Sequence, residues 1–102
     1  MSIKKFFLTK QAALDIQDIT EYIARDSIEN ATLFADELLE VCRSIPDFPE
    51  RGRIVPEVGH PQLREIIYKN YRLVYTVRKG EIYILQVFNA ARLLRMQDIK
   101  LE

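Results

Sequence analysis

The sequence predicts an α+β fold, in which an N-terminal strand and an antiparallel pair of helices precede a three-stranded antiparallel meander, with the helices packed on one face of the sheet. Apolar residues recur at helical spacing in two segments, 10–25 and 28–45. Three later segments are rich in β-branched and aromatic residues, as strands are: 63–68, 71–78 and 82–89. The chain of 102 residues has the size of one domain, so we expect a single domain over 1–102.

The N-terminal elements are predicted by two capping residues. Thr9 ends a short apolar strand over 3–8 and can cap the first helix, whose carboxylates Asp15, Asp18 and Glu21 are expected to turn away from its apolar stripe. Ser27 can cap the second helix. The apolar stripes of the two helices are formed by Ala12, Ile16, Ile19 and Ile23, and by Ala31, Phe34, Ala35, Leu38, Val41, Cys42 and Ile45. The stripe position of Cys42 predicts a small core residue and not a reactive thiol.

The segment 46–62 contains all four prolines and two of the three glycines, which predicts one ordered loop. Loops of this length in small domains tend to be functional, but this loop can equally be a crossover that carries the chain from helix to sheet. Both interpretations are open at the level of sequence.

Two-residue turns between the predicted strands, at 69–70 and 79–80, set the expected register of the meander. In this register one face holds Glu65, Ile67, Arg72, Val74, Thr76, Arg78, Tyr83, Leu85, Val87 and Asn89. The opposite face holds Arg64, Ile66, Tyr68, Tyr71, Leu73, Tyr75, Val77, Ile82, Ile84 and Phe88. Because the second face is more apolar, we expect the helices to cover it and Arg64 to find a structural partner at its edge. The first face is expected to stay open.

Composition and charge restrict the possible functions. Apolar residues make up 48% and charged residues 29% of the chain, which excludes a disordered protein. The net charge is zero, yet residues 1–50 carry about −5 and residues 51–102 about +5, so a specific partner is favoured over bulk nucleic acid. One cysteine and one histidine leave no Cys/His metal cluster, and we expect neither metal nor cofactor. No apolar run has the length of a membrane span or the character of a signal peptide, so we expect no membrane association and a cytoplasmic location.

The order of elements resembles that of the RelE/ParE superfamily of type II toxin-antitoxin toxins. The resemblance covers nearly the whole chain and is carried by three motifs: Pro49-Glu50-Arg51-Gly52-Arg53-Ile54-Val55-Pro56-Glu57, Leu63-Arg64-Glu65 and Tyr71-Arg72-Leu73-Val74-Tyr75. It implies a bacterial growth inhibitor encoded beside an antitoxin that wraps and neutralises it. RelE-like members cleave messenger RNA on the ribosome, whereas ParE-like members poison DNA gyrase.

The candidate catalytic residues separate these branches only in part. Metal-free RNA cleavage needs a base, an acid and cations that stabilise the phosphate. The resemblance implies Arg72 as the cation and Glu57 as the base. Leu63 and Glu65 stand where RelE-like ribonucleases carry lysines, and Asn89 and Ala90 stand where a related subgroup carries histidine and tyrosine. Since asparagine exchanges no proton near neutral pH, the ParE-like branch and gyrase are favoured. A ribosome-dependent ribonuclease and an inactive paralogue are the alternatives.

The predicted binding residues lie on the open face and in the tail. We expect Arg72, Asn89, Arg92 and Arg95 to contact the target. The apolar residues expected to bind the antitoxin are Ile67, Val74, Leu85 and Val87.

Overall fold

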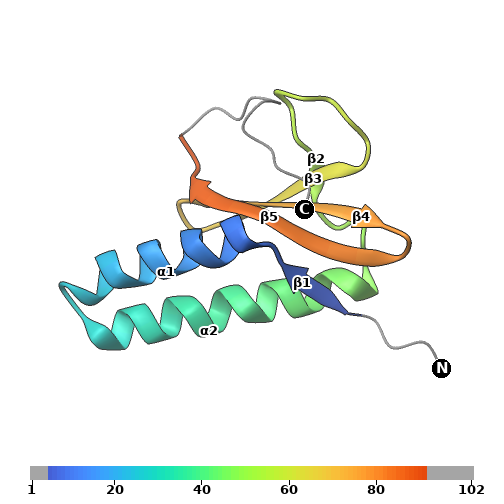
Figure 1. Ribbon diagram of the computed structural model, residues 1–102. Coiled ribbons are helices and arrows are strands. Elements are labelled where there is room, and N and C mark those ends of the chain that lie inside the picture. Colours follow the sequence, from blue (N-terminus) through green and yellow to red (C-terminus); the bar gives the residue numbers. More distant parts are fainter. Residues whose placement is uncertain (1–4, 92–102) are drawn as a thin grey trace.

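Two helices and a mixed sheet form the frame of the molecule, as the computed structural model, which describes residues 5–91, makes plain (Figure 1). Within these residues the sheet has five strands in the order β1-β5-β4-β3-β2. The elements in chain order are β1 (Phe6–Leu8), α1 (Lys10–Ala24), α2 (Ile28–Ser44), the 3₁₀ turn η1 (Ile45–Asp47), β2 (Arg53–Ile54), β3 (Leu63–Tyr68), β4 (Tyr71–Arg78) and β5 (Glu81–Asn89). The predicted fold class is therefore confirmed.

Both helices begin at the predicted caps. The Thr9 hydroxyl accepts a hydrogen bond from the Ala12 N–H at 3.2 Å, and the Ser27 hydroxyl accepts one from the Asn30 N–H at 3.1 Å. Thr9 also fixes the start of α1 on the sheet, because its hydroxyl and its backbone N–H both donate to the Ile84 carbonyl, at 2.8 and 3.0 Å. The chain therefore passes from β1 to α1 at a point bonded to β5.

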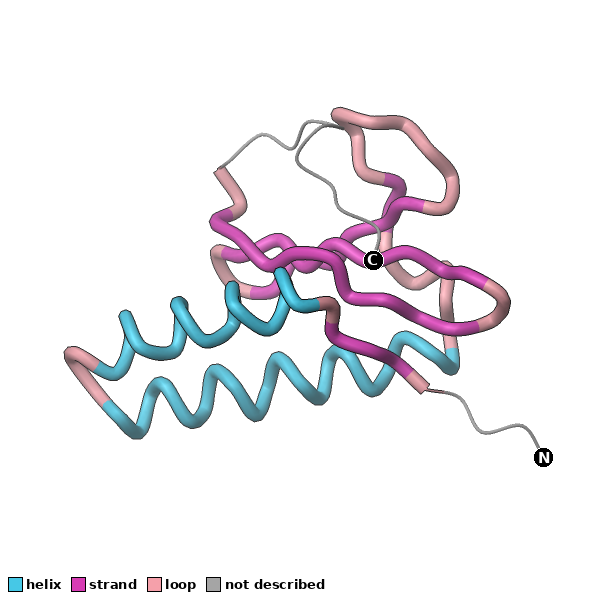
Figure 2. The backbone as a smooth tube through the Cα atoms, viewed as in Figure 1, coloured by secondary structure: helices cyan, strands magenta, loops and turns pink. Residues whose placement is uncertain are grey.

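The strand pairing confirms the predicted turns and adds two short edge strands. β3, β4 and β5 form the antiparallel meander, closed at the pairs Tyr68–Tyr71 and Arg78–Glu81. β1 runs parallel to β5 at one edge, and the two-residue β2 pairs with β3 at the other. β2 lies inside the predicted loop 46–62, where a strand of two residues leaves no periodic signal in the sequence. Figure 2 shows the long loop between β2 and β3 on the side of the sheet away from the helices.

A β-bulge in β5 makes the predicted faces wrong beyond the middle of that strand. Leu85 is the extra residue, so the side chains that follow it lie on the faces opposite to those expected. Val87 packs in the helix-side core, and Phe88 lies on the other face. Asn89 pairs with Tyr71, which packs against the helix-side core. The pairs on either side of the bulge are Val74 with Gln86 and Tyr75 with Ile84.

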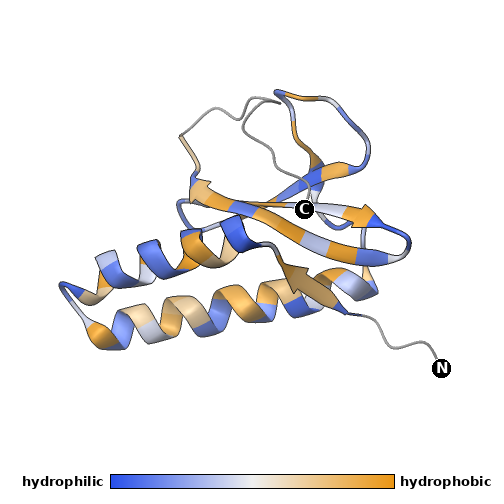
Figure 3. Ribbon diagram, viewed as in Figure 1, coloured by the Kyte–Doolittle hydropathy of each residue, from blue (hydrophilic) through white to orange (hydrophobic). Residues whose placement is uncertain are grey.

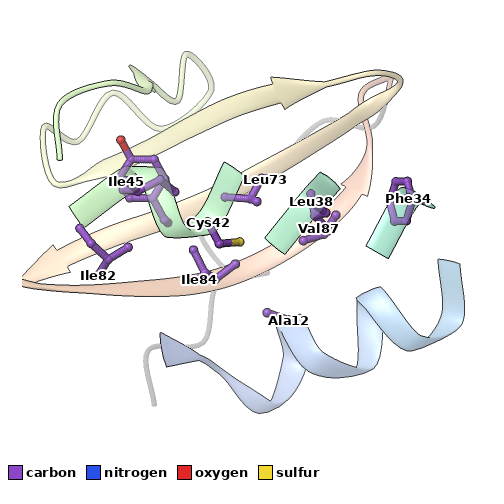
Figure 4. Close-up of a cluster of buried hydrophobic side chains, with 10 residues drawn as sticks. Ala12, Phe34, Leu38, Cys42, Ile45, Leu73, Ile82, Ile84 and Val87 are labelled. Carbon is purple, nitrogen blue, oxygen red and sulfur yellow. The ribbon is translucent and has the colours of Figure 1, made fainter. Parts of the chain in front are cut away.

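The main core lies between the helical hairpin and the sheet, where the apolar sides of α1 and α2 meet the apolar side of the strands (Figures 3 and 4). Its buried members are Ala12, Phe34, Leu38, Cys42, Ile45, Leu73, Tyr75, Ile82, Ile84 and Val87. Cys42 is fully buried, as predicted, and burial raises the pKa of its thiol to about 12.

The opposite face of the sheet is covered and not open as predicted. A second buried cluster joins the segment after β2 to the sheet, and its members are Val55, Leu63, Val74, Leu85 and Phe88, with Val58 and Tyr83 packed against it. The apolar side chains of this segment supply the cover that the sequence interpretation assigned to a partner. The long loop is therefore part of the scaffold as well as of the surface.

Candidate functional site

A network of four charged side chains lies on the sheet face opposite the helices. Its centre is Arg72 on β4, whose side chain is only 5% exposed. Glu65 on β3 is fully buried beside it, Glu57 reaches it from the loop after β2, and Arg53 reaches Glu65 from β2. Three neighbouring strands and the loop after β2 thus supply one charged side chain each.

The two carboxylates divide the hydrogen-bond donors of Arg72 between them. Glu57 takes both terminal nitrogens, with distances of 2.5 Å from Nη1 to Oε2 and 2.7 Å from Nη2 to Oε1. Glu65 Oε1 accepts from Nε at 2.7 Å and lies 2.6 Å from Nη2. This forked recognition is specific to guanidinium, since a lysine ammonium can offer neither the planar pair nor the Nε donor.

The second oxygen of Glu65 is held by Arg53. Arg53 Nε donates to Glu65 Oε2 at 2.6 Å, and Nη2 lies at the same distance. The Arg72 guanidinium also lies 5.3 Å from the centre of the Phe88 ring, a cation–π contact. That contact exists because the bulge in β5 turns Phe88 onto this face.

The network is electrically balanced. Two arginines and two glutamates sum to zero, and the hydrogen bonds to Glu57 and then to Glu65 raise the pKa of Arg72 further above its ordinary value against the opposing effect of burial. A buried cation saturated by carboxylates presents little net charge to an incoming phosphate. The arrangement is suited to holding the loop against the sheet and to shaping a surface.

The loop that carries Glu57 is closed at its base. Val55 N–H donates to the Leu63 carbonyl at 3.1 Å, and the Gly59 N–H donates back to the Val55 carbonyl at 2.8 Å. Gly59 has a φ of +72°, a left-handed conformation that glycine adopts without strain. The segment is therefore a closed loop of the kind that packs its own apolar side chains beneath it.

A second set of contacts fixes the entrance to β2. The Tyr75 hydroxyl donates to the Pro49 carbonyl at 2.7 Å and accepts from the Gly52 N–H at 2.9 Å. Arg64 Nη1 donates to the Gly52 carbonyl at 2.9 Å, which confirms its predicted structural role. A Cβ on Gly52 would lie 2.6 Å from the Glu65 carbonyl oxygen, so this position has no space for a side chain.

One residue that supports the site was assigned wrongly by the sequence. Asp15 was expected to face away from the core, yet its Oδ2 accepts from the Val87 N–H of the bulged strand at 2.9 Å. Gln11 Nε2 donates to Asp15 Oδ1 at 2.7 Å. The carboxylate thus satisfies a backbone group beside the bulge, and only the tertiary structure reveals that need.

The predicted binding residues are only partly brought together. Ile67 is 49% exposed and pairs with Arg72 on β4, so it lies at the surface beside the network. Val74 and Leu85 are buried under the loop, which contradicts their expected place on an open strip, and Val87 lies on the helix side. Asn89 is exposed, but it faces away from Arg72 because the bulge in β5 shifts the register of the strand by one residue. Arg92 and Arg95 lie outside the described residues.

Comparisons with known proteins agree on the class. The family described as the ParE toxin of the type II toxin-antitoxin system parDE matches residues 6–94. Toxin RelE2 of Caulobacter vibrioides is 33% identical over 86 residues, which cover 83% of this chain and 93% of that protein.

Two solved structures share the fold. A structure described as the chromosomal ParDE toxin-antitoxin system of P. aeruginosa has a TM-score of 0.70 at 20% identity and covers 84% of this chain and 95% of that chain. A conserved hypothetical protein of Helicobacter pylori has a TM-score of 0.58 at 21% identity and covers 90% of this chain and 100% of the other.

The family match and the similar relative, in agreement with the fold, define a toxin of the RelE/ParE superfamily. Within that superfamily the chain belongs to the ParE toxin family of type II toxin-antitoxin systems, and it therefore has an antitoxin as a partner. Among residues 5–91, no helix has the length and apolar character needed to cross a bilayer.

Proposed function

We propose that this toxin inhibits growth by binding DNA gyrase, without itself catalysing a reaction. The observation that supports this proposal is the saturation of Arg72, which is 5% exposed and bonded to two carboxylates. A metal-free ribonuclease needs a cation that can reach the phosphate and a base that can reach the 2′-hydroxyl. In the present arrangement the same two groups neutralise each other. The toxin acts in the cytoplasm, where gyrase is found.

A ribosome-dependent ribonuclease is the second candidate. The observation in its favour is the direct contact between Glu57 and Arg72, the two residues that the family resemblance pairs for RNA cleavage. The similarity to a protein named Toxin RelE2 points the same way. For such an enzyme, binding of RNA would have to separate the pair and free the carboxylate of Glu57.

A Glu57→Gln variant separates the two candidates. Glutamine keeps the size of the side chain and an acceptor oxygen but cannot take up a proton, so ribonuclease activity that uses Glu57 as its base should fall by ~10²–10⁴. A gyrase-binding toxin should lose far less. Glu50→Gln, in the same loop region and exposed, is the matched control.

The decisive measurements are messenger 5′ ends mapped after brief induction and supercoiling by purified gyrase with ATP and the toxin. We expect inhibited supercoiling, accumulated cleaved DNA and toxicity that survives Glu57→Gln. Codon-phased messenger cleavage that Glu57→Gln abolishes, with supercoiling intact, would refute the gyrase proposal. Absence of growth arrest with either protein would indicate an inactive paralogue.

We also propose that the antitoxin contacts the surface around Ile67. This side chain is the exposed member of the predicted strip and lies beside Arg72. Ile67→Asp should weaken the complex by at least tenfold in calorimetry, because the carboxylate would lose its hydration in the interface while Arg72 beside it is already bonded to two carboxylates. Ile54→Asp, at a similarly exposed position on β2, is the control. Equal affinities for the wild type and Ile67→Asp would exclude this surface.

A further inference from the structure

A separate pocket lies between the loop after η1, the start of β3 and the end of β4. It has a volume of about 350 Å³. Val77 lines it and also packs against the helix-side core, so the pocket lies on the face of the sheet opposite the Arg72 network. Figure 1 shows the β4–β5 turn, whose Lys79 lines the pocket as well, at the end of the molecule where α2 ends. No residue of the Arg72 network takes part in the lining.

The pocket contains a half-buried arginine, Arg64, that forms no ion pair among residues 5–91. Its Nη1 donates to the Gly52 carbonyl at 2.9 Å, the one hydrogen bond of this guanidinium within the described residues. Arg53 and Arg72, by contrast, are both bonded to glutamates. Because a guanidinium carries five N–H donors, Arg64 has donors left for an anion in the pocket.

The second cation of the pocket, Lys79, has a backbone conformation that lysine rarely adopts. Lys79 and Gly80 have φ of +52° and +79°, the two left-handed residues of a type I′ turn, whose first position favours Asn, Asp or Gly. Lys69, in the β3–β4 turn, is also left-handed, but its Nζ lies 3.4 Å from Glu37 Oε1 and contacts the Tyr68 ring. Within residues 5–91 Lys79 has no such partner, so a ligand is the better explanation for a lysine at this position.

The lining is suited to an anion that carries several oxygens and an apolar remainder. Arg64 and Lys79 bring two positive charges from different elements, which the solvent-exposed Glu50 offsets only in part. The fork of an arginine and the point charge of a lysine are both common ligands of phosphate. The pocket is several times larger than a phosphate group, and its apolar walls are formed by Pro49, Pro61 and Val77.

We propose that this pocket binds the phosphate of a nucleotide, with Arg64 and Lys79 on the phosphate oxygens and the apolar walls against the sugar or base. Gln62, whose side-chain amide both donates and accepts, lines the pocket where it can bond to a sugar hydroxyl or a base edge. A free nucleotide and one nucleotide of a nucleic-acid strand offer the same chemistry. The proposal rests on the pocket alone and holds for either target of the toxin.

The test titrates the full-length toxin with ATP, inorganic phosphate, a short oligothymidylate and an oligoglutamate peptide, and follows the chemical shifts of its backbone amides. We expect ATP to shift the amides of Gln62, Arg64 and Lys79, and inorganic phosphate to shift the same amides with lower affinity. Tighter binding of ATP than of oligothymidylate would identify a free nucleotide as the source of the phosphate, and the reverse order would identify a nucleic-acid strand.

A substitution that suits the turn separates binding from stability. Lys79→Asn should weaken ATP binding roughly tenfold, because one charge-assisted contact is lost. Its Tm should stay at the wild-type value or rise, because asparagine adopts the left-handed conformation more readily. Arg78→Gln removes the same charge at an exposed neighbour outside the pocket, and Lys69→Asn repeats the substitution in the other turn. Both controls should change the affinity less than about twofold, because solvent screens charges outside the pocket.

Several outcomes would overturn the assignment. An equal loss of affinity in Lys79→Asn and Arg78→Gln would mean general attraction to basic residues. The absence of shifts with millimolar ATP, or shifts that exclude the pocket, would mean that this site binds no nucleotide. Inorganic phosphate that binds as tightly as ATP would exclude the nucleotide, and an oligoglutamate peptide that does so would make the ligand a protein carboxylate. Wild-type affinity in Lys79→Asn, or a marked loss of its stability, would mean that the lysine serves the turn and not a ligand.

Discussion

The contact between Asp15 and the bulged strand offers a direct test of how the fold positions its charged network. Replacement by alanine removes the acceptor of the Val87 N–H, 2.9 Å away, and the partner of Gln11. A hydrogen bond to a charged group contributes about 1.5–3 kcal/mol, and an N–H left without a partner accounts for much of its loss. We therefore expect Asp15→Ala to lower the free energy of unfolding by about 2 kcal/mol.

The assay is thermal and urea unfolding of the purified toxin, followed by circular dichroism. In a domain of this size, a loss of 1 kcal/mol lowers Tm by about 4–8 °C, so the expected decrease is about 8–16 °C. Asp15→Asn keeps an acceptor oxygen and should cost less than about 1 kcal/mol, whereas Asp18→Ala, an exposed carboxylate on the same helix, should stay within about 0.5 kcal/mol. Equal stabilities for Asp15→Ala and Asp18→Ala would refute the reasoning.

Amide hydrogen exchange locates the effect. Loss of the acceptor should accelerate exchange at Val87 in Asp15→Ala more than at strand residues remote from the bulge. If the register of β5 shifts as well, Phe88 leaves its position 5.3 Å from the Arg72 guanidinium. Wild-type exchange at Val87 in Asp15→Ala would show that the helix does not hold this part of the strand.

Four other tests, three by substitution and one by chemical reaction, examine the site and its surroundings. Gly52→Ala should destabilise the fold by about 1–3 kcal/mol in urea unfolding, because the added Cβ meets backbone of β3 at 2.6 Å; unchanged stability would mean that the loop can move away. Tyr75→Phe should cost about 1–3 kcal/mol in the same assay through two unsatisfied backbone groups, unless water replaces the hydroxyl. The pKa of about 12 leaves roughly a thousandfold less Cys42 thiolate at pH 8 than a pKa of 9 would, so Ellman's reagent should react far faster after unfolding in urea; equal rates would contradict burial. Arg72→Lys should reduce both stability and toxicity but less than Arg72→Ala, which leaves buried Glu65 with one cationic partner at a cost of about 3–5 kcal/mol; toxicity undiminished in both would exclude the network from function.

The helix starts and the strands of the meander were predictable from sequence, because capping residues and β-branched side chains act locally. Thr9 and Ser27 cap their helices as expected, and the strands of the meander begin and end within one residue of the predicted ranges. The bulge at Leu85 was not predictable, because no turn residue or break in β-propensity marks it. The Val87 N–H beside the bulge donates to Asp15, which is more than 70 residues away in sequence. A one-residue error in register then reversed the faces of Val87 and Phe88.

The candidate site was predictable only as a pair of residues. The family resemblance brought Glu57 and Arg72 forward, and their side chains do meet. Glu65 was singled out only because it stands where related ribonucleases carry a lysine. Its structural role was missed, because nothing in an isolated sequence indicates that it is fully buried between two arginines. Such an arrangement is stable only when several elements supply opposite charges at once.

The balance of the network bears on how this toxin recognises partners. A site of two arginines and two glutamates exerts little long-range attraction, so the network does not guide a partner by its net charge. Its contribution is geometric, because the forked bonds of Arg72 hold the loop through Glu57 and the strand through Glu65. Attraction at a distance must then come from the uneven charge of the two halves of the chain. We therefore propose that recognition combines long-range attraction by the surface charge with short-range fit at a surface whose shape the network maintains.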